Sequence, residues 1–153
     1  MKRLAVILMI VISFGLYGAQ DGQNQDGVFL DKSNNPYNGE YSEKYENGNL
    51  KMKLTFKDGI KDGEVYIYYE NGKLNEIRSY KMGIKHGKWT IYNSQGIKTA
   101  EANYNNDQKD GKWYIWDDSG VLRYEMIYAN GKRSGLWKTY DEEGILAAEK
   151  SYN

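Results

Sequence analysis

Hydrophobic and polar positions alternate along much of the chain after residue 36. Residues 50–56 place Leu, Met, Leu and Phe at every second position, with Lys, Lys and Thr between them. Residues 63–70 are rich in aromatic and β-branched side chains. Both features are typical of β-strands, and the alternation predicts a strand with one buried face. Positions 76, 78, 100 and 102 hold Glu, Arg, Ala and Ala, so we expect that face to be only partly apolar.

Glycine recurs at intervals of 24 residues, in two complete columns of five. The first column is Gly39, Gly63, Gly87, Gly111 and Gly135, and the second is Gly48, Gly72, Gly96, Gly120 and Gly144. A third column holds Gly59, Gly83 and Gly131, with Asp107 in the remaining place. A fixed period of this length predicts a tandem-repeat architecture, and we interpret the ten glycines of the two complete columns as structural repeat residues.

Each repeat is predicted to be a hairpin of two strands, with Asn47-Gly48 and Asn71-Gly72 as strong turn signals. The predicted fold is all-β, an elongated antiparallel meander of about ten strands with open ends. At roughly 4.8 Å per strand it would extend about 45–50 Å. The expected organisation is a targeting segment at 1–19, a polar linker at 20–35 and repeats at about 36–61, 62–85, 86–109, 110–133 and 134–153. Within the linker, Val28-Phe29-Leu30 is expected to be a half-repeat that caps the array.

Aromatic side chains form further columns with the same period. One column holds Tyr41, Val65, Trp89, Trp113 and Trp137, and another Phe56, Tyr80, Tyr104, Tyr128 and Tyr152. The candidate partner-binding residues are Tyr68, Tyr92, Trp116 and Tyr140, three positions after the valine and tryptophan column. In a regular strand an offset of three places two residues on opposite faces, so this column would face solvent. The alternative is that both columns are structural, through cross-strand pairs or a bulge.

The first nineteen residues resemble a secretory signal. Lys2 and Arg3 precede an apolar run from Leu4 to Leu16, and small residues follow before a polar stretch. The run is short for a membrane-spanning helix, which needs roughly 17–25 residues. Tyr17 stands where a small residue is preferred for cleavage after Ala19, so an uncleaved membrane anchor stays an alternative. We therefore expect an exported protein, periplasmic or extracellular, with membrane contact only through residues 1–19.

The composition argues against catalysis and against nucleic-acid binding. The chain has 21 basic and 21 acidic residues, and without Lys2 and Arg3 the numbers are 19 and 21. This near-balance lacks the excess of basic residues that is typical of nucleic-acid-binding proteins. The chain has no Cys and a single histidine, His86, so the usual zinc ligand set is missing. Asp117-Asp118 lacks the spaced oxygen ligands of a calcium loop and is interpreted as a solvated turn. We predict no catalytic residues, no metal and no cofactor, hence no enzyme.

The motif Gly-Lys-Trp followed by an aromatic residue and a glycine resembles the variant form of the MORN repeat. It stands as Gly87-Lys88-Trp89 with Tyr92 and Gly96, and again at 111–120 with Trp113 and Trp116. The resemblance covers roughly residues 27–153 and implies the β-hairpin repeat fold. It also implies links to membranes and protein scaffolds, and for bacterial members an antitoxin-like role in toxin–antitoxin systems.

These observations favour a non-catalytic extracytoplasmic scaffold that contacts a protein or cell-envelope partner. Extended repeat surfaces suit binding. The alternatives are an antitoxin or immunity-like component that binds a toxin, and recognition of glycans or choline by exposed aromatic side chains.

Overall fold

The computed structural model describes residues 23–25 and 27–153, and the predicted targeting segment lies outside them. The described residues form strands and turns and contain no helix. The strands are β1 (Gln23–Gln25), β2 (Val28–Leu30), β3 (Gly39–Lys44), β4 (Leu50–Lys57), β5 (Ile60–Lys61), β6 (Gly63–Tyr68), β7 (Leu74–Lys81), β8 (Ile84–Tyr92), β9 (Lys98–Asn105), β10 (Gln108–Lys109), β11 (Gly111–Trp116), β12 (Leu122–Ala129), β13 (Lys132–Tyr140) and β14 (Leu146–Tyr152).

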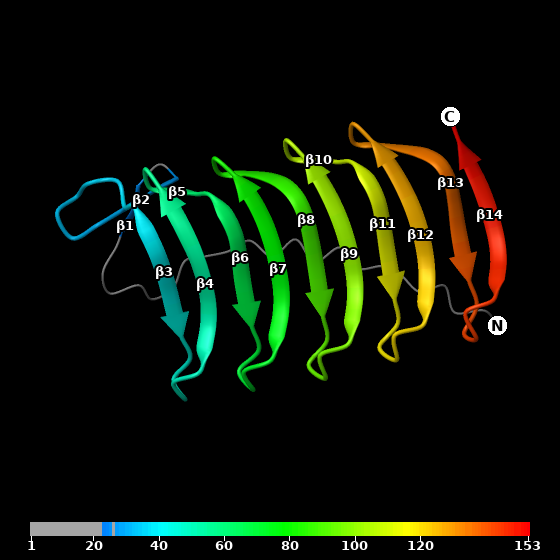
Figure 1. Ribbon diagram of the computed structural model, residues 1–153, viewed down its shortest axis with the longest axis horizontal. Coiled ribbons are helices and arrows are strands. Elements are labelled where there is room, and N and C mark those ends of the chain that lie inside the picture. The colour runs from blue at the N-terminus through cyan, green and yellow to red at the C-terminus, as the bar shows by residue number, and fades with distance from the viewer. Residues whose placement is uncertain (1–22, 26) are drawn as a thin grey trace.

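Twelve of these strands make one antiparallel sheet. Ten lie side by side in the order in which they occur in the sequence, from β3 to β14, and the short strands β5 and β10 pair with β4 and β9 (Figure 1). The sheet is open, with β3 at one edge and β14 at the other. This confirms the predicted all-β meander of hairpin repeats.

The hairpin turns at one end of the sheet contain the glycines of the second column. In the fourth repeat the Gly120 amide donates to the Asp117 carbonyl at 3.0 Å, and Gly120 has a φ of 90°. Directly before this turn the register shifts between Ile115 and Trp116. The same shift recurs before the turns of the other four repeats.

Hairpins at the other end use two consecutive residues with positive φ. Asn130-Gly131 has φ values of 48° and 80°, and Met82-Gly83 has 49° and 81°. Two such residues define the type I′ turn, whose twist matches that of paired strands. Asp107, the departure in the third glycine column, also adopts a φ of 64°, and its carboxylate accepts a hydrogen bond from the Lys85 amide at 2.8 Å.

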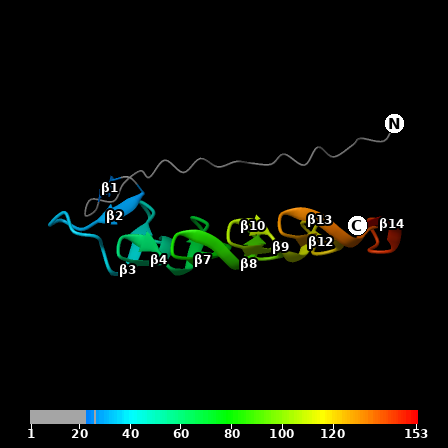
Figure 2. The same cartoon turned by 90° about the horizontal axis from the view of Figure 1, so that it is seen from above.

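The most buried side chains gather at the N-terminal end of the sheet. Leu54 and Val65 are 2% and 4% exposed, and Phe29 stacks on Phe56 with ring centroids 4.6 Å apart. Phe29 comes from β2, which pairs with β1 outside the main sheet. Figure 2 shows this hairpin above one end of the sheet. The segment Val28–Leu30 thus covers a face of the first repeat and adds no strand at the edge.

Gly59 is the point where this N-terminal hairpin docks. Its carbonyl accepts a hydrogen bond from the Phe29 amide at 2.8 Å, and its φ is 72°. A Cβ at this position would overlap Val28 Cγ1 and lie 2.7 Å from the Phe29 carbonyl oxygen. Glycine is therefore needed here for both its conformation and its size.

Candidate binding faces of the sheet

Aromatic rings from seven consecutive strands form a continuous row on one face of the sheet. Neighbouring centroids are 4.9–5.7 Å apart and the rings are tilted or edge-on. We call this row the ring ladder; its members are Tyr80, Trp89, Tyr104, Trp113, Tyr128, Trp137 and Tyr152. Such pairs contribute about 0.5–1.5 kcal/mol each beyond the area they bury. The ring ladder therefore stabilises a sheet that has only one layer.

The face that carries the ring ladder, here the ladder face, is covered differently at its two ends. The β1–β2 hairpin lies over the first repeat through Phe29, which contacts Tyr41 and Phe56. No other element of the described chain lies over this face (Figure 2). The rings from Tyr80 onward are half-buried, so they are packed against one another and still reach the surface.

A column of cationic side chains runs along the ring ladder, one for each repeat after the first. Lys85 Nζ lies 5.2 Å from the Trp89 centroid and 5.3 Å from that of Tyr104. The distances from Lys109 Nζ to Trp113 and Tyr128 are 4.4 Å and 4.9 Å. We call this column the cation row; its members are Lys61, Lys85, Lys109 and Arg133, and the two outer members also lie over ladder rings.

The cation row has acidic groups nearby but no ion-pair partner in the described part of the chain: the Asp107 carboxylate accepts a hydrogen bond from the Lys85 amide at 2.8 Å, and Glu76 pairs with Arg78 at 2.6 Å. None of its four members forms an ion pair with a described carboxylate within 4.0 Å. Burial lowers the pKa of Lys61 below its usual value, and the nearby Arg78 lowers it further. Burial likewise lowers the pKa of Lys109, with a contribution from Arg133. These positive charges lose hydration and gain no carboxylate in return, so an anion placed on this face would stabilise them.

The indole N–H groups of the ring ladder are already used within the sheet. Trp89 donates to the Ser79 carbonyl at 3.1 Å, Trp113 to Asn103 at 3.0 Å and Trp137 to Ile127 at 2.9 Å. A ligand on the ladder face therefore meets ring faces and cations, and the indole donors are not available to it.

The four candidate residues found from the sequence are half-buried, Tyr68, Tyr92, Trp116 and Tyr140 alike. Trp116 stacks on Tyr114 with centroids 5.6 Å apart and lies under Lys98 Nζ at 4.3 Å. Tyr140 donates a hydrogen bond to Glu125 at 3.3 Å. Tyr114 pairs with Glu125 across β11 and β12, and the next pair along is Trp113 with Met126, on the ladder face. Successive residues of a strand point to opposite faces, so Tyr114 and Glu125 point away from the ladder face. Trp116 and Tyr140 thus lie on the opposite face, and partner binding through this column stays a prediction.

Ion pairs dominate that opposite face, here the ion-pair face. Glu101 contacts Lys88 at 3.0 Å and Lys98 at 3.1 Å. Burial alone would raise the pKa of Glu101, but the hydrogen bonds from these two lysines outweigh it, and the pKa lies below its usual value. Further pairs are Lys53–Glu40 and Lys138–Glu149. The two faces therefore differ in chemistry: the cation row of the ladder face forms no described ion pair, although Arg78 on that face pairs with Glu76 at 2.6 Å, whereas the charges named on the opposite face are matched.

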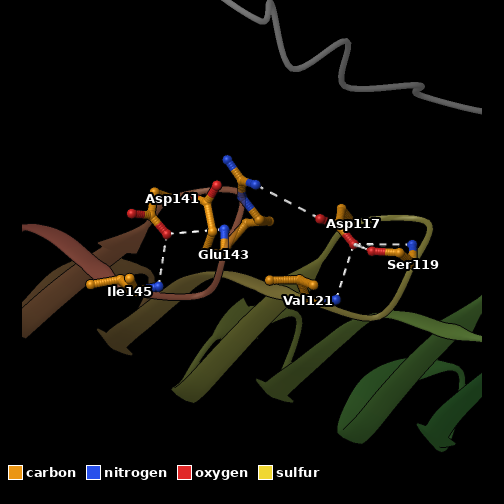
Figure 3. Close-up of polar contacts among 7 residues, drawn as sticks. Asp117, Ser119, Val121, Asp141, Glu143 and Ile145 are labelled. Carbon is orange, nitrogen blue, oxygen red and sulfur yellow. Dashed lines mark hydrogen bonds and ion pairs between the residues drawn. The ribbon is translucent and has the colours of Figure 1, made fainter.

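The acidic residues Asp117 and Asp118 lie in a turn, as the sequence indicates. The Asp117 carboxylate accepts hydrogen bonds from the amides of Ser119 and Val121, both at 3.0 Å (Figure 3). The hydroxyl of Ser119 and these amides lower the pKa of Asp117. Asp141 repeats the arrangement with Glu143 and Ile145. Because these carboxylate oxygens accept hydrogen bonds from backbone amides of their own turns, their role is to stabilise the turns. No cluster of metal-ligating side chains occurs among the described residues.

His86 occupies a column that links neighbouring repeats. At the equivalent positions, Asp62 accepts a hydrogen bond from the Met82 amide at 2.9 Å and Asp110 one from Asn130 at 3.1 Å. The Nδ1 atom of His86 is buried and has no hydrogen-bond partner in the described structure. No nucleophile or carboxylate pairs with His86 in the described hydrogen bonds and ion pairs, and its side chain makes no described counterpart of the bonds of Asp62 and Asp110.

The cation row was missed in the sequence, although a signal was present. Lys61, Lys85, Lys109 and Arg133 follow the same 24-residue period as the glycines. Lysine and arginine are common at surface positions, so a periodic column of them does not by itself indicate a binding surface; the cross-strand register places it beside the rings.

The geometry defines a class of protein, an open single-layer array of β-hairpins with two chemically distinct faces. A sequence model of the MORN repeat variant matches residues 37–58, 61–82, 85–106, 109–130 and 133–153, and the chain belongs to this family. A search of curated proteins gave no match. MORN repeats are generally protein- or membrane-interaction repeats, and the family is typically a non-catalytic scaffold. Within the described residues we find no helix long and apolar enough to span a membrane.

Proposed function

We propose that this protein is a non-catalytic scaffold that acts outside the cytoplasm and presents the ladder face to a protein or cell-envelope partner. The observation that carries the proposal is the cation row, four positive side chains that form no described ion pair. They lie on a face that the β1–β2 hairpin covers at the first repeat alone. Charges left unmatched in a surface favour an oppositely charged partner.

The ring ladder supports the same conclusion through rigidity. Each of the five inner rings is held by two neighbours, and the tryptophans are also fixed by hydrogen bonds from their indole N–H groups. A surface that is ordered before binding loses little conformational freedom when a partner docks. Tyr and Trp are enriched at interfaces for this reason and for their large contact area.

The N-terminal sequence supports export. Lys2 and Arg3 followed by an apolar run are the marks of a secretory signal. An alkaline phosphatase fused after Asn153 would test this part of the proposal, since that enzyme is active only after export. Activity that persists when residues 1–19 are deleted would contradict it.

Two triple variants test which face binds. The ladder-face variant is Lys85→Gln/Lys109→Gln/Arg133→Gln, and the ion-pair-face variant is Tyr92→Ala/Trp116→Ala/Tyr140→Ala. Both are compared with the mature chain in affinity capture from the native envelope fraction, after circular dichroism has shown that each folds. We expect the partner to be lost with the first variant and kept with the second. If only the second variant loses the partner, the binding face is that of the Tyr68 column. If the mature chain captures no specific partner, the proposal of a binding scaffold is wrong.

A further inference from the structure

The spacing of the cation row narrows the chemistry of the partner. Consecutive members come from consecutive repeats, and each repeat advances the sheet by two strands. Strands lie about 4.7–4.9 Å apart, so the positive charges recur about every 9.4–9.8 Å along the sheet. A ligand that matches every member of the row must present an anion at this interval.

Among extended polypeptide conformations, polyproline II matches this interval. It has three residues per turn and rises 3.1 Å per residue, so every third side chain points the same way at steps of about 9.3 Å. A β-strand presents same-side residues about every 6.6 Å, because its period is two and its rise about 3.3 Å. The row therefore fits a carboxylate at every third residue of a polyproline II segment and does not fit an acidic β-strand.

The ring ladder suits the same conformation. Polyproline II segments dock on surfaces lined with aromatic rings, because their backbone is already ordered and their prolines pack on ring faces. Here the rings run continuously beside the cations, and each central cation lies over a Trp–Tyr pair. The indole donors are occupied by Ser79, Asn103 and Ile127, so prolines would contact ring faces while carboxylates meet the cations.

We propose that the ladder face binds an acidic segment of a partner protein in polyproline II conformation, lying along the long axis of the sheet with a carboxylate at every third residue. This inference rests on the proposed function, because it assumes that the ladder face is the binding face. It adds the class, the direction and the periodicity of the ligand.

A pair of peptides of equal composition tests the inference. One has four Pro-Pro-Glu triplets, and the other has the same twelve residues with the four Glu adjacent. Binding of each fluorescent peptide to the mature chain is measured by anisotropy at two salt concentrations. We expect the periodic peptide to bind at least about tenfold more tightly than the clustered one, which amounts to about 1.4 kcal/mol, and to weaken with salt.

Variants of equal charge separate a specific row from general attraction. Lys85→Gln/Lys109→Gln/Arg133→Gln removes three charges from the ladder face, and Lys88→Gln/Lys112→Gln/Lys138→Gln removes three others from outside the cation row. We expect the periodic peptide to bind the first variant at least about tenfold more weakly and the second almost as well as the wild type. Equal losses in both variants would overturn the inference.

Two further results would overturn the inference and leave the scaffold standing. One is equal affinity for the two peptides, which would show attraction to charge alone. The other is binding of phosphatidylserine vesicles through the cation row with no binding of the periodic peptide, which would make the ligand a membrane surface. In either case envelope capture that depends on the ladder face would still support the proposed function, so the two failures are distinguishable.

Discussion

The two faces of this sheet use the same residue types in different ways. The ladder face combines lysines and arginines with aromatic rings and leaves the cation row without a described ion pair, while Arg78 on the same face pairs with Glu76. The ion-pair face sets Lys88 and Lys98 against Glu101 and stacks Trp116 on Tyr114. In a single-layer sheet no second sheet decides which face is the interior. The ring contacts make one face the main source of stability, and the same face keeps unmatched charge for binding.

The largest expected effect comes from removing one tryptophan on each face. Trp113→Ala loses contacts with Tyr104 and Tyr128 and the hydrogen bond to Asn103. We expect the free energy of unfolding to fall by about 3 kcal/mol. Trp116→Ala loses one stacked ring and one cation contact, and we expect about 1 kcal/mol. Urea denaturation measures both values, and equal losses would contradict the assignment of the ladder face as the stabilising one.

The next effect distinguishes the covered part of the ladder face from the open part. Gly59→Ala adds a Cβ that overlaps Val28 where the β1–β2 hairpin docks, and we expect a loss of about 2–3 kcal/mol. Gly48→Ala is the matched control, with a φ of 85° and no atom within 4 Å of the added Cβ. Here only the backbone conformation is strained, and we expect a loss of about 1 kcal/mol. Thermal unfolding of the two variants would show no difference if the hairpin did not dock on Gly59.

A smaller effect concerns the ion pairs of the ion-pair face and depends on pH. Glu101→Gln weakens the contacts with Lys88 and Lys98, and we expect a loss of about 0.5–1 kcal/mol at pH 7. The pKa of Glu101 in the folded protein is below its usual value of 4.5. Its contribution is therefore complete above about pH 4.5 and is lost as the pH falls through the folded pKa. Denaturation at pH 7 and pH 3 should show the difference between wild type and variant shrinking, and a constant difference would refute the prediction.

The smallest effect has the opposite pH dependence and concerns the cation row. Because burial lowers the pKa of Lys61 below 10.5, the unfolded chain binds more protons than the folded protein between the two pKa values. The free energy of unfolding of the wild-type protein therefore rises with pH in that interval because of Lys61. Lys61→Met should remove this rise, so the stability difference between variant and wild type narrows from pH 8 to pH 10.5. A difference that does not change over this range would show that the ladder face does not desolvate Lys61.

Much of the fold follows from the sequence because the period repeats one local solution. The second glycine column closes the turns at one end of the sheet, and the first column lies in the strands, as at the start of β6 and within β8. All ten glycines have positive φ, as at Gly120 with 90°. Alternation along residues 50–56 indicates one apolar face, and the register confirms it by pairing Tyr41 with Leu54 and Gly39 with Phe56. These features depend on residues close in the chain, where propensity and turn chemistry decide.

The candidate binding surface was harder to predict for a physical reason. The offset of three predicts that the Tyr68 column faces away from the tryptophans, and two of its members do lie on the opposite face. The sequence does not show that Lys85 reaches Tyr104, nineteen positions away, because that contact depends on cross-strand register. The register shifts within each repeat, as between Arg78 and Tyr80, and a shift of one position changes which side chains meet.

The sequence by itself determined the repeat length, the two strands of each hairpin and the positions of the turns. These properties are local, since a glycine, a turn carboxylate or an alternating run acts within a few residues. Only the tertiary structure decided that the rings join into one ladder, that the cation row lies over them and that Phe29 covers one face of the first repeat. Those outcomes require strands from different repeats to align, and alignment follows from bulges and cross-strand packing that no single segment specifies.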